Sequence, residues 1–207
     1  MKALSFIYAL HSCLSSYSEK TVFVDLFDCD KTQNRVCYVS TQFEKWRPDA
    51  KDFRKQDIGK PLRGWIGENW VNYKSLDVRA LLLKRIDLAK SKKCQGIDFD
   101  NIDGHLNDTG FKLTSTDQKE FISFLSAESH KRGLLLGLKN SPETAKSLTH
   151  LVDFHVAEEC SKYKECDRYP NDKTFFIEYM EPKKEICAAR PYTLFSDYSL
   201  GRFKKCQ

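Results

Sequence analysis

The 207-residue sequence lacks an apolar run as long as the ~18 residues that a membrane-spanning helix needs. It also lacks a basic block, because 34 Lys and Arg are interspersed among 29 Asp and Glu, for a formal net charge of +5. The first absence excludes a membrane-spanning helix. The second argues against nucleic-acid binding, which uses clustered basic and aromatic side chains.

Motifs for nucleotide cofactors and for zinc are missing as well. There is no GxGxxG, no phosphate-binding loop and no GxSxG nucleophile motif. There is no CxxC, and the five histidines form no HExxH. We therefore expect no cofactor and no metal.

The composition that is present is typical of one globular domain. Apolar residues make up 41% of the chain, charged residues 30% and aromatic residues 13%, with no repeat or linker-like segment. A chain of this size buries roughly 70% of the surface of its unfolded form, so we expect a monomer with a complete core.

The first 18 residues, MKALSFIYALHSCLSSYS, have the three-part plan of a secretory signal. Lys2 precedes a mostly apolar stretch, and Ser16 and Ser18 are small enough for positions −3 and −1 of a cleavage site. This interpretation predicts a signal peptide at 1–18, a domain at 19–207, secretion to the extracellular space and no membrane contact after signal removal. The alternative is a first buried strand or helix.

One of the eight cysteines would leave with the signal, and an oxidising compartment favours disulfide bonds among the others. Cys160 lies close to Cys166 in CSKYKEC, and Cys187 and Cys206 share the C-terminal segment, so two local pairs are predicted. Cys37 lies in the apolar run RVCYVS and is interpreted as a small buried hydrophobic residue.

From about residue 75 onward, helical and strand patterns alternate, which is typical of βαβ units around a parallel sheet. Apolar spacing and end signals predict helices from Ser75 to near Lys93, from Thr114 to Gly133 and from Pro142 through Val152. About eight strands of this sheet are predicted, at residues 22–26, 35–39, 70–73, 96–99, 134–138, 154–157, 174–178 and 193–196. A barrel and an open doubly wound sheet both fit the alternation.

Acidic residues follow several of these strands, at the ends where parallel α/β folds place functional residues. They are Asp25, Asp28, Asp98, Asp100, Asp103, Glu158, Glu159 and Glu178. Paired carboxylates suit glycoside hydrolysis, in which one protonates the leaving oxygen and the other is the nucleophile or activates water. Such residues can also cap helices or hold Ca²⁺ or Mg²⁺, although the regular spacing of a calcium loop is absent.

Tryptophans near the same strand ends favour a carbohydrate ligand, because sugar rings stack on aromatic planes. Trp46 follows the second predicted strand, and Trp65 and Trp70 flank Glu68 in GWIGENW. Tryptophans are also large core residues. We assign Trp65 to the core and leave Trp70 open between core and ligand.

The sequence contains a series of motifs, in order along the chain, that carry a family resemblance. The motifs are DLFD (25–28), CYVS (37–40), WRPD (46–49), IGKPLRGWIGENWVN (58–72), GIDFDNIDGH (96–105), NDTGFKLTSTDQ (107–118), GLLLGLKN (133–140), AEECSKYKEC (157–166) and FIEY (176–179). Residues 21–206 resemble glycoside hydrolase family 114, the endo-α-1,4-polygalactosaminidases. The resemblance implies a (β/α)8 TIM-type barrel that cleaves galactosamine-containing polysaccharide internally.

The resemblance also implies site residues. The catalytic pair would be Asp100, as nucleophile or base, and Glu158, as general acid, with the roles open to exchange. The substrate-binding residues would be Asp25, Asp98, Asn101, Lys139, Asn140, Glu178, Tyr179 and Trp70. A galactosamine polymer without acetyl groups is cationic, so an acidic site suits it.

The sequence departs from the family pattern in places. Asp98-Phe99 replaces the usual Glu-Pro, and Ala157-Glu158-Glu159 replaces Asn-Glu-Gln. The chain is also short beside the ~250 residues of a typical barrel. Only about five residues, 30–34, separate the first two predicted strands, so the first helix is expected to be missing. The alternative function is therefore a carbohydrate-binding relative without turnover.

Overall fold

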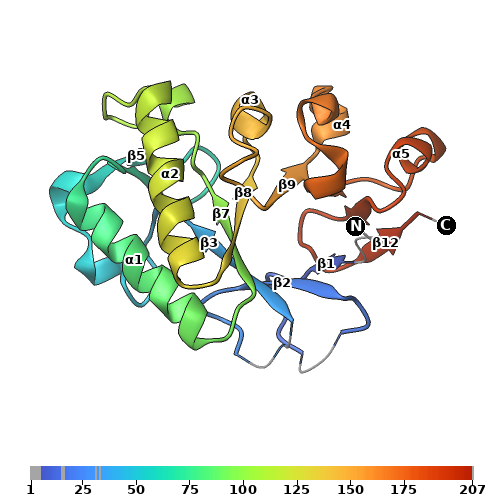
Figure 1. The fold of residues 1–207 in the computed structure, drawn as a ribbon, viewed down its shortest axis with the longest axis horizontal. Helices are drawn as coiled ribbons and strands as arrows, with labels where there is room; N and C mark the ends of the chain where they lie inside the picture. The colour runs from blue at the N-terminus through green and yellow to red at the C-terminus, as the bar shows by residue number, and fades with distance from the viewer. Residues whose placement is uncertain (1–5, 15–16, 31, 33, 207) are drawn as a thin grey trace.

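The computed structural model describes residues 6–14, 17–30, 32 and 34–206. Its main feature is a nine-stranded sheet that forms a nearly closed barrel with helices on its outer side (Figure 1). Neighbouring strands are parallel except for the last pair. The spatial order is β1 (Phe6–Tyr8), β2 (Thr21–Asp25), β3 (Arg35–Ser40), β7 (Gly96–Asp100), β8 (Leu135–Lys139), β9 (Phe154–Glu158), β10 (Thr174–Glu178), β11 (Leu194–Ser196) and β12 (Phe203–Lys205). The predicted (β/α)8-type barrel is confirmed, with one added antiparallel strand.

The strand predicted at 70–73 exists but lies outside the barrel. It is β6 (Glu68–Val71), which pairs antiparallel with β4 (Phe43–Glu44) and β5 (Ile58–Pro61) in a separate small sheet. Its assignment to the barrel is wrong because its backbone groups pair within this second sheet. The eighth parallel strand of the barrel comes instead from residues 6–8.

The N-terminal segment contains a buried strand, β1, which agrees with the second of its two interpretations. Phe6 and Tyr8 are buried, and β1 pairs with β2 in parallel register from Phe6 opposite Thr21. Cleavage after Ser18 would remove this strand. The signal peptide at 1–18 stays a prediction, and Ser16 of its cleavage site lies outside the described residues.

The two long predicted helices are confirmed, and the third is shorter than predicted. The helices are α1 (Leu76–Ser91), α2 (Ser115–Lys131), α3 (Pro142–Ala145), α4 (Cys160–Tyr163) and α5 (Lys184–Ala189). Beyond α3, the hydroxyls of Ser147 and Thr149 donate to backbone carbonyls of the preceding turn, which competes with regular helix bonding. None of these helices, in the part of the chain that is described, is long and apolar enough to cross a membrane.

The first two βα units of the barrel are reduced to loops. The described residues between β1 and β2, and between β2 and β3, form no helix. The missing helix was expected between β2 and β3, and the β1–β2 connection was not predicted. Even so, β2 and β3 pair directly, from Val22 opposite Arg35 to Asp25 opposite Tyr38. The shortened unit is therefore a compact connection, and it leaves no gap in the sheet.

Four disulfides hold these loops and the C-terminal segment. The predicted pairs Cys160–Cys166 and Cys187–Cys206 are confirmed. Cys13–Cys29 joins the two helix-free connections, and Cys37–Cys94 joins β3 to the segment before β7. Cys37 is buried as predicted, but it is not a simple apolar residue because it forms a disulfide with Cys94, which precedes the neighbouring strand β7.

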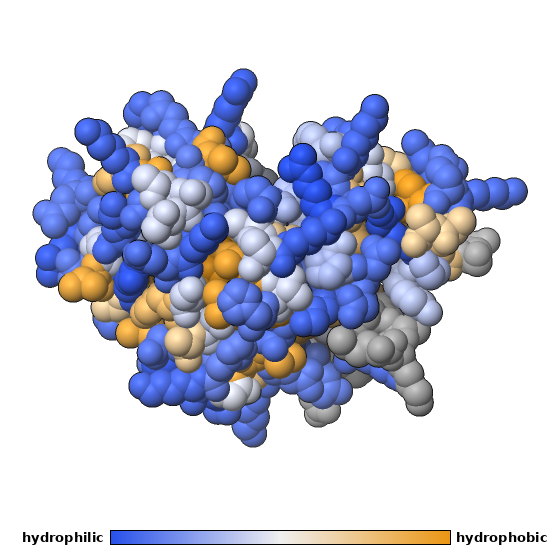
Figure 2. Space-filling view, turned by 45° about the horizontal axis from the view of Figure 1, so that its top comes forward, coloured by the Kyte–Doolittle hydropathy of each residue, from blue (hydrophilic) through white to orange (hydrophobic). Residues whose placement is uncertain are grey.

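An aromatic cluster fills the barrel interior. The rings of Phe6 and Phe175 lie 4.9 Å apart between centroids, and those of Phe23 and Phe175 also 4.9 Å, so β1, β2 and β10 meet inside the barrel. A second apolar layer lies under α1 and α2. The outer face in Figure 2 is largely hydrophilic, with small scattered hydrophobic groups.

Candidate active site

Three adjacent barrel strands end in residues that the sequence analysis singled out. β7 ends at Asp100, β8 at Lys139 and β9 at Glu158, and all three line a cleft of about 720 Å³. The residue that follows each strand has a left-handed backbone, with φ between 50° and 58°. Residues other than Gly and Asn rarely adopt this conformation. The chain thus turns sharply at each of these strand ends.

Lys139 bridges the two carboxylates. Its Nζ lies 2.9 Å from Oδ2 of Asp100 and 2.6 Å from Oε2 of Glu158. Burial alone would lower the pKa of the Lys139 ammonium, but the two carboxylates outweigh burial and hold this pKa well above its usual value. Lys139 therefore stays protonated and holds the two carboxyl groups close to each other.

Each carboxylate has further donors that fix its position. The Tyr38 hydroxyl donates to Asp100 over 3.0 Å, and the backbone N–H of Asn101 donates to the other oxygen over 2.8 Å. Asn140 Nδ2 donates to Glu158 over 2.7 Å, and the Tyr179 hydroxyl donates to its second oxygen. Burial raises the pKa of both tyrosines, so they remain donors. The site is thereby organised before substrate binds.

Asp25 lies in the same cleft but belongs to a second charge network. Arg47 donates two hydrogen bonds to the Asp25 carboxylate, of 2.8 and 2.5 Å, and two to Glu44, of 2.9 and 3.1 Å. Sequence reasoning missed the roles of Arg47, Glu44 and Tyr38. Arg47 does lie within the WRPD motif, which was the available signal.

The cleft is strongly acidic although the chain is net positive. It is lined by two Lys or Arg side chains and eight carboxyl groups, which are Asp25, Asp28, Glu44, Glu68, Asp100, Glu158, Glu159 and Glu165. The acidic site predicted at the strand ends is thus present in the structure. A concave site with carboxylates on its walls concentrates cationic ligands.

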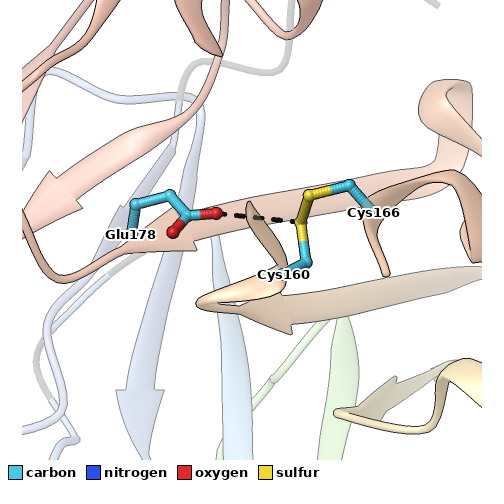
Figure 3. A group of neighbouring side chains, drawn as sticks. All are labelled: Cys160, Cys166 and Glu178. Carbon is cyan, nitrogen blue, oxygen red and sulfur yellow. Dashed lines mark hydrogen bonds between the residues drawn. A yellow bond between two sulfur atoms is a disulfide. The ribbon is translucent and has the colours of Figure 1, made fainter. Parts of the chain in front are cut away.

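Three of the expected substrate-binding residues do not line the cleft. Trp70 is 7% exposed and packs in the small sheet. Glu178 accepts a 2.9 Å hydrogen bond from the backbone of Ser161 and lies beside the Cys160–Cys166 disulfide (Figure 3). Because these two sulfurs are bonded to each other, they offer no thiolate to a metal. Asp98, the third, has no exposed surface.

Asp98 lies on β7, two residues before Asp100. The Tyr8 hydroxyl of β1 donates to one of its oxygens over 2.8 Å, and the other oxygen has no partner in the described structure. Burial raises the pKa of Asp98 to about 7; nearby Lys139 opposes this rise, while the charges of Asp100 and Glu158 add to it. Asp98 therefore keeps its proton in acidic solution up to about pH 7.

We expect Asp98→Asn to alter the pH dependence of stability. The usual carboxyl pKa is 3.8, so between pH 4 and 7 folded Asp98 keeps a proton that the unfolded chain has released, and the wild type loses stability as pH rises. Asparagine does not titrate. Urea unfolding at several pH values should show the variant gaining roughly 2–4 kcal/mol relative to wild type across this window. A difference that does not vary with pH would contradict the assignment.

Two tryptophans stand on the cleft wall. Trp46 is 52% exposed and Trp65 is 64% exposed, and both line the cleft. The assignment of Trp65 to the core is wrong, because it lies in the β5–β6 loop between Gly64 and Gly67, whose φ values of 90° and 91° form a tight turn. More than half of each of these side chains is therefore exposed.

Comparison with known proteins agrees with this geometry. The model of glycoside-hydrolase family GH114 matches residues 4–206. Ega3 of Aspergillus fumigatus, whose crystal structure was determined in complex with galactosamine, is 30% identical, with a TM-score of 0.89 over 99% of this chain and 96% of that chain. The comparison with curated proteins found no match to this chain.

The glycoside hydrolase domain of PelA from Pseudomonas aeruginosa has the same fold. Its TM-score is 0.68 at 13% identity, over 99% of this chain and 98% of that chain. The fold similarity therefore extends well beyond detectable sequence similarity. Because the family match spans nearly the whole chain, this protein belongs to glycoside hydrolase family GH114 and is a glycoside hydrolase.

Proposed function

We propose that this protein cleaves internal α-1,4-galactosaminide bonds in galactosamine-containing polysaccharide, using Asp100 and Glu158. The observation that carries the proposal is the pair of carboxylates bridged by Lys139 inside an acidic cleft. The 30% identical relative Ega3, which binds galactosamine in its crystal structure, supports the substrate class.

The carboxylate separation supports a retaining mechanism. The contacts of 2.9 and 2.6 Å to the Lys139 nitrogen limit the distance between Asp100 Oδ2 and Glu158 Oε2 to at most about 5.5 Å, which is shorter than the roughly 6.5–9.5 Å of inverting enzymes. An inverting enzyme needs a wider gap, because a water molecule must fit between the carboxylate and the sugar.

In the proposed reaction Asp100 attacks the anomeric carbon while Glu158 donates its proton to the departing glycosidic oxygen. This forms a covalent glycosyl–Asp100 ester and releases the first product. Glu158 then takes a proton from water, whose oxygen attacks the same carbon and frees Asp100. The ammonium of Lys139 keeps the two carboxyl groups at this spacing throughout.

The alternative of a binding protein without turnover is not favoured by a specific observation. It rested on an incomplete barrel, whereas β2 and β3 pair directly and both carboxylates are held by several donors. We also propose that the protein acts outside the cell, since four disulfides are typical of proteins from oxidising compartments.

The experiment that tests this function is digestion of partially de-N-acetylated galactosamine polymer with the purified protein. Internal cleavage should give oligomers of intermediate length first and little monosaccharide, as followed by size-exclusion chromatography. Absence of any oligomer after long incubation would contradict the proposal. Release of monosaccharide from the start would instead indicate attack at chain ends.

A further inference from the structure

Glu68 differs from the other buried carboxylates of the cleft. It is 7% exposed and lines the cleft, yet its side chain has no hydrogen bond or ion pair within the described structure. Glu44, by contrast, is held by Arg47, and Asp100 is held by Lys139. A carboxylate that is mostly buried, faces the cleft and has no partner within the described structure is available to a ligand in the cleft.

The surroundings of Glu68 favour a cationic partner. Glu68 at the start of β6 lies directly opposite Glu44 on β4, a like-charge pair that destabilises a sheet. Burial, followed by the charges of Glu44 and Asp100, raises the pKa of Glu68 to about 7 against the opposing effect of Arg47 and Lys139. Near neutral pH the empty site therefore holds a mixture of acid and carboxylate.

A metal ion fits these surroundings poorly. Within the described residues, the His, Cys, Asp and Glu side chains that lie close enough together to share an ion are Cys160, Cys166 and Glu178, and Glu68 belongs to no such group. A single carboxylate instead matches a single ammonium, which donates charge-assisted hydrogen bonds.

We propose that Glu68 binds the ammonium group of a galactosamine residue in the cleft and selects the free amine over its N-acetylated form. The inference rests on the proposed function and adds a specificity residue to it. A neighbouring aromatic residue supports a sugar at this position, because Trp65, in the loop three residues before Glu68, is exposed and lines the same cleft. The backbone N–H of Glu68 also donates to the Trp65 carbonyl over 3.2 Å.

The chemistry explains the selection. An ammonium replaces the proton of Glu68, which then becomes fully ionised and accepts hydrogen bonds from the ligand nitrogen. An acetamido group is neutral, so it cannot compensate the charge of the carboxylate and leaves the protonation of Glu68 unchanged. Binding of the free amine near pH 7 should therefore release a fraction of a proton, and binding of the acetylated sugar should not.

The test is calorimetric titration of wild type, Glu68→Gln and Glu68→Asp with galactosamine and with N-acetylgalactosamine. We expect Glu68→Gln to weaken galactosamine binding at least tenfold and N-acetylgalactosamine binding less than twofold. Glu68→Asp should recover part of the loss. Titrations in buffers of different ionisation enthalpy should detect proton release with galactosamine in wild type and none in Glu68→Gln.

Asp28→Asn is the matched control, because Asp28 also lines the cleft but its side chain is 73% exposed. Solvent screening should limit its effect to less than twofold for both sugars. Equal losses for both sugars in Glu68→Gln, an Asp28→Asn effect of the same size, unchanged proton release, or no galactosamine binding by wild type would each overturn the proposal.

These measurements need no turnover. A protein that binds galactosamine through Glu68 but cleaves no polymer would keep this inference and refute the proposed function. A protein that cleaves the polymer but fails the titration criteria would refute this inference and keep the proposed function.

Discussion

Glu158→Gln and Asp100→Asn should each lower the rate of polymer cleavage by roughly 10²–10⁴-fold, with little change in the melting temperature. Both substitutions keep the side-chain volume and an oxygen for the donors seen here, which are Lys139 with Tyr38 or Asn140. They remove the group that forms the ester or moves the proton in the proposed reaction. Initial rates at saturating polymer and thermal unfolding of the same samples check this expectation.

Azide distinguishes the roles of the two residues. With an oligomer that carries an α-fluoride leaving group, Asp100→Ala should accept azide from the vacated face and give the β-glycosyl azide. Glu158→Ala should still form the Asp100 ester and then give the α-glycosyl azide. The reverse pattern would exchange the roles, and near wild-type cleavage by either variant would remove that residue from the catalytic pair.

Deletion of residues 1–18 should unfold most of the protein at room temperature. It removes β1, which buries Phe6 and Tyr8, the hydrogen bond from Tyr8 to Asp98, and the Cys13–Cys29 disulfide. Each buried side chain contributes about 1.5–3 kcal/mol and the disulfide about 3 kcal/mol. This loss is comparable with the whole stability of a domain, about 5–15 kcal/mol.

Thermal unfolding of chains 1–207 and 19–207, both produced under oxidising conditions, measures the effect. Cys13→Ser in the full chain is the control, because it removes the disulfide and keeps β1. If the 19–207 chain melts at the same temperature as the full chain, β1 is dispensable. Sequencing the N-terminus of the secreted protein then tests cleavage after Ser18 directly.

Seven of the eight parallel barrel strands, and the acidic residues at the ends of several of them, could be predicted from local sequence. Buried parallel strands form short apolar runs, and β7 and β9 each end directly in the acidic residue of interest. The chain direction of parallel strands then brings those ends to one edge. No knowledge of distant contacts was needed for that step.

Other features depend on distant contacts and could not be predicted in this way. A short apolar segment near an N-terminus has the same local pattern in a signal peptide and in β1, and pairing with β2 distinguishes them. The pairing of β6 with β4 and β5 likewise sets the exposure of Trp65 and Trp70. The sequence marks Glu68 only by its tryptophan neighbours, because its lack of a hydrogen-bond or ion-pair partner is a property of the folded cleft.

The most direct test of the proposed function is a proton NMR time course of a galactosamine oligomer with wild-type protein. The proposed retaining mechanism, with the Asp100 and Glu158 oxygens no more than about 5.5 Å apart, predicts that the α-anomer of the new reducing end appears first and then mutarotates. It also predicts no signal with Glu158→Gln over the same period. Initial appearance of the β-anomer, or no cleavage by wild type, would contradict it.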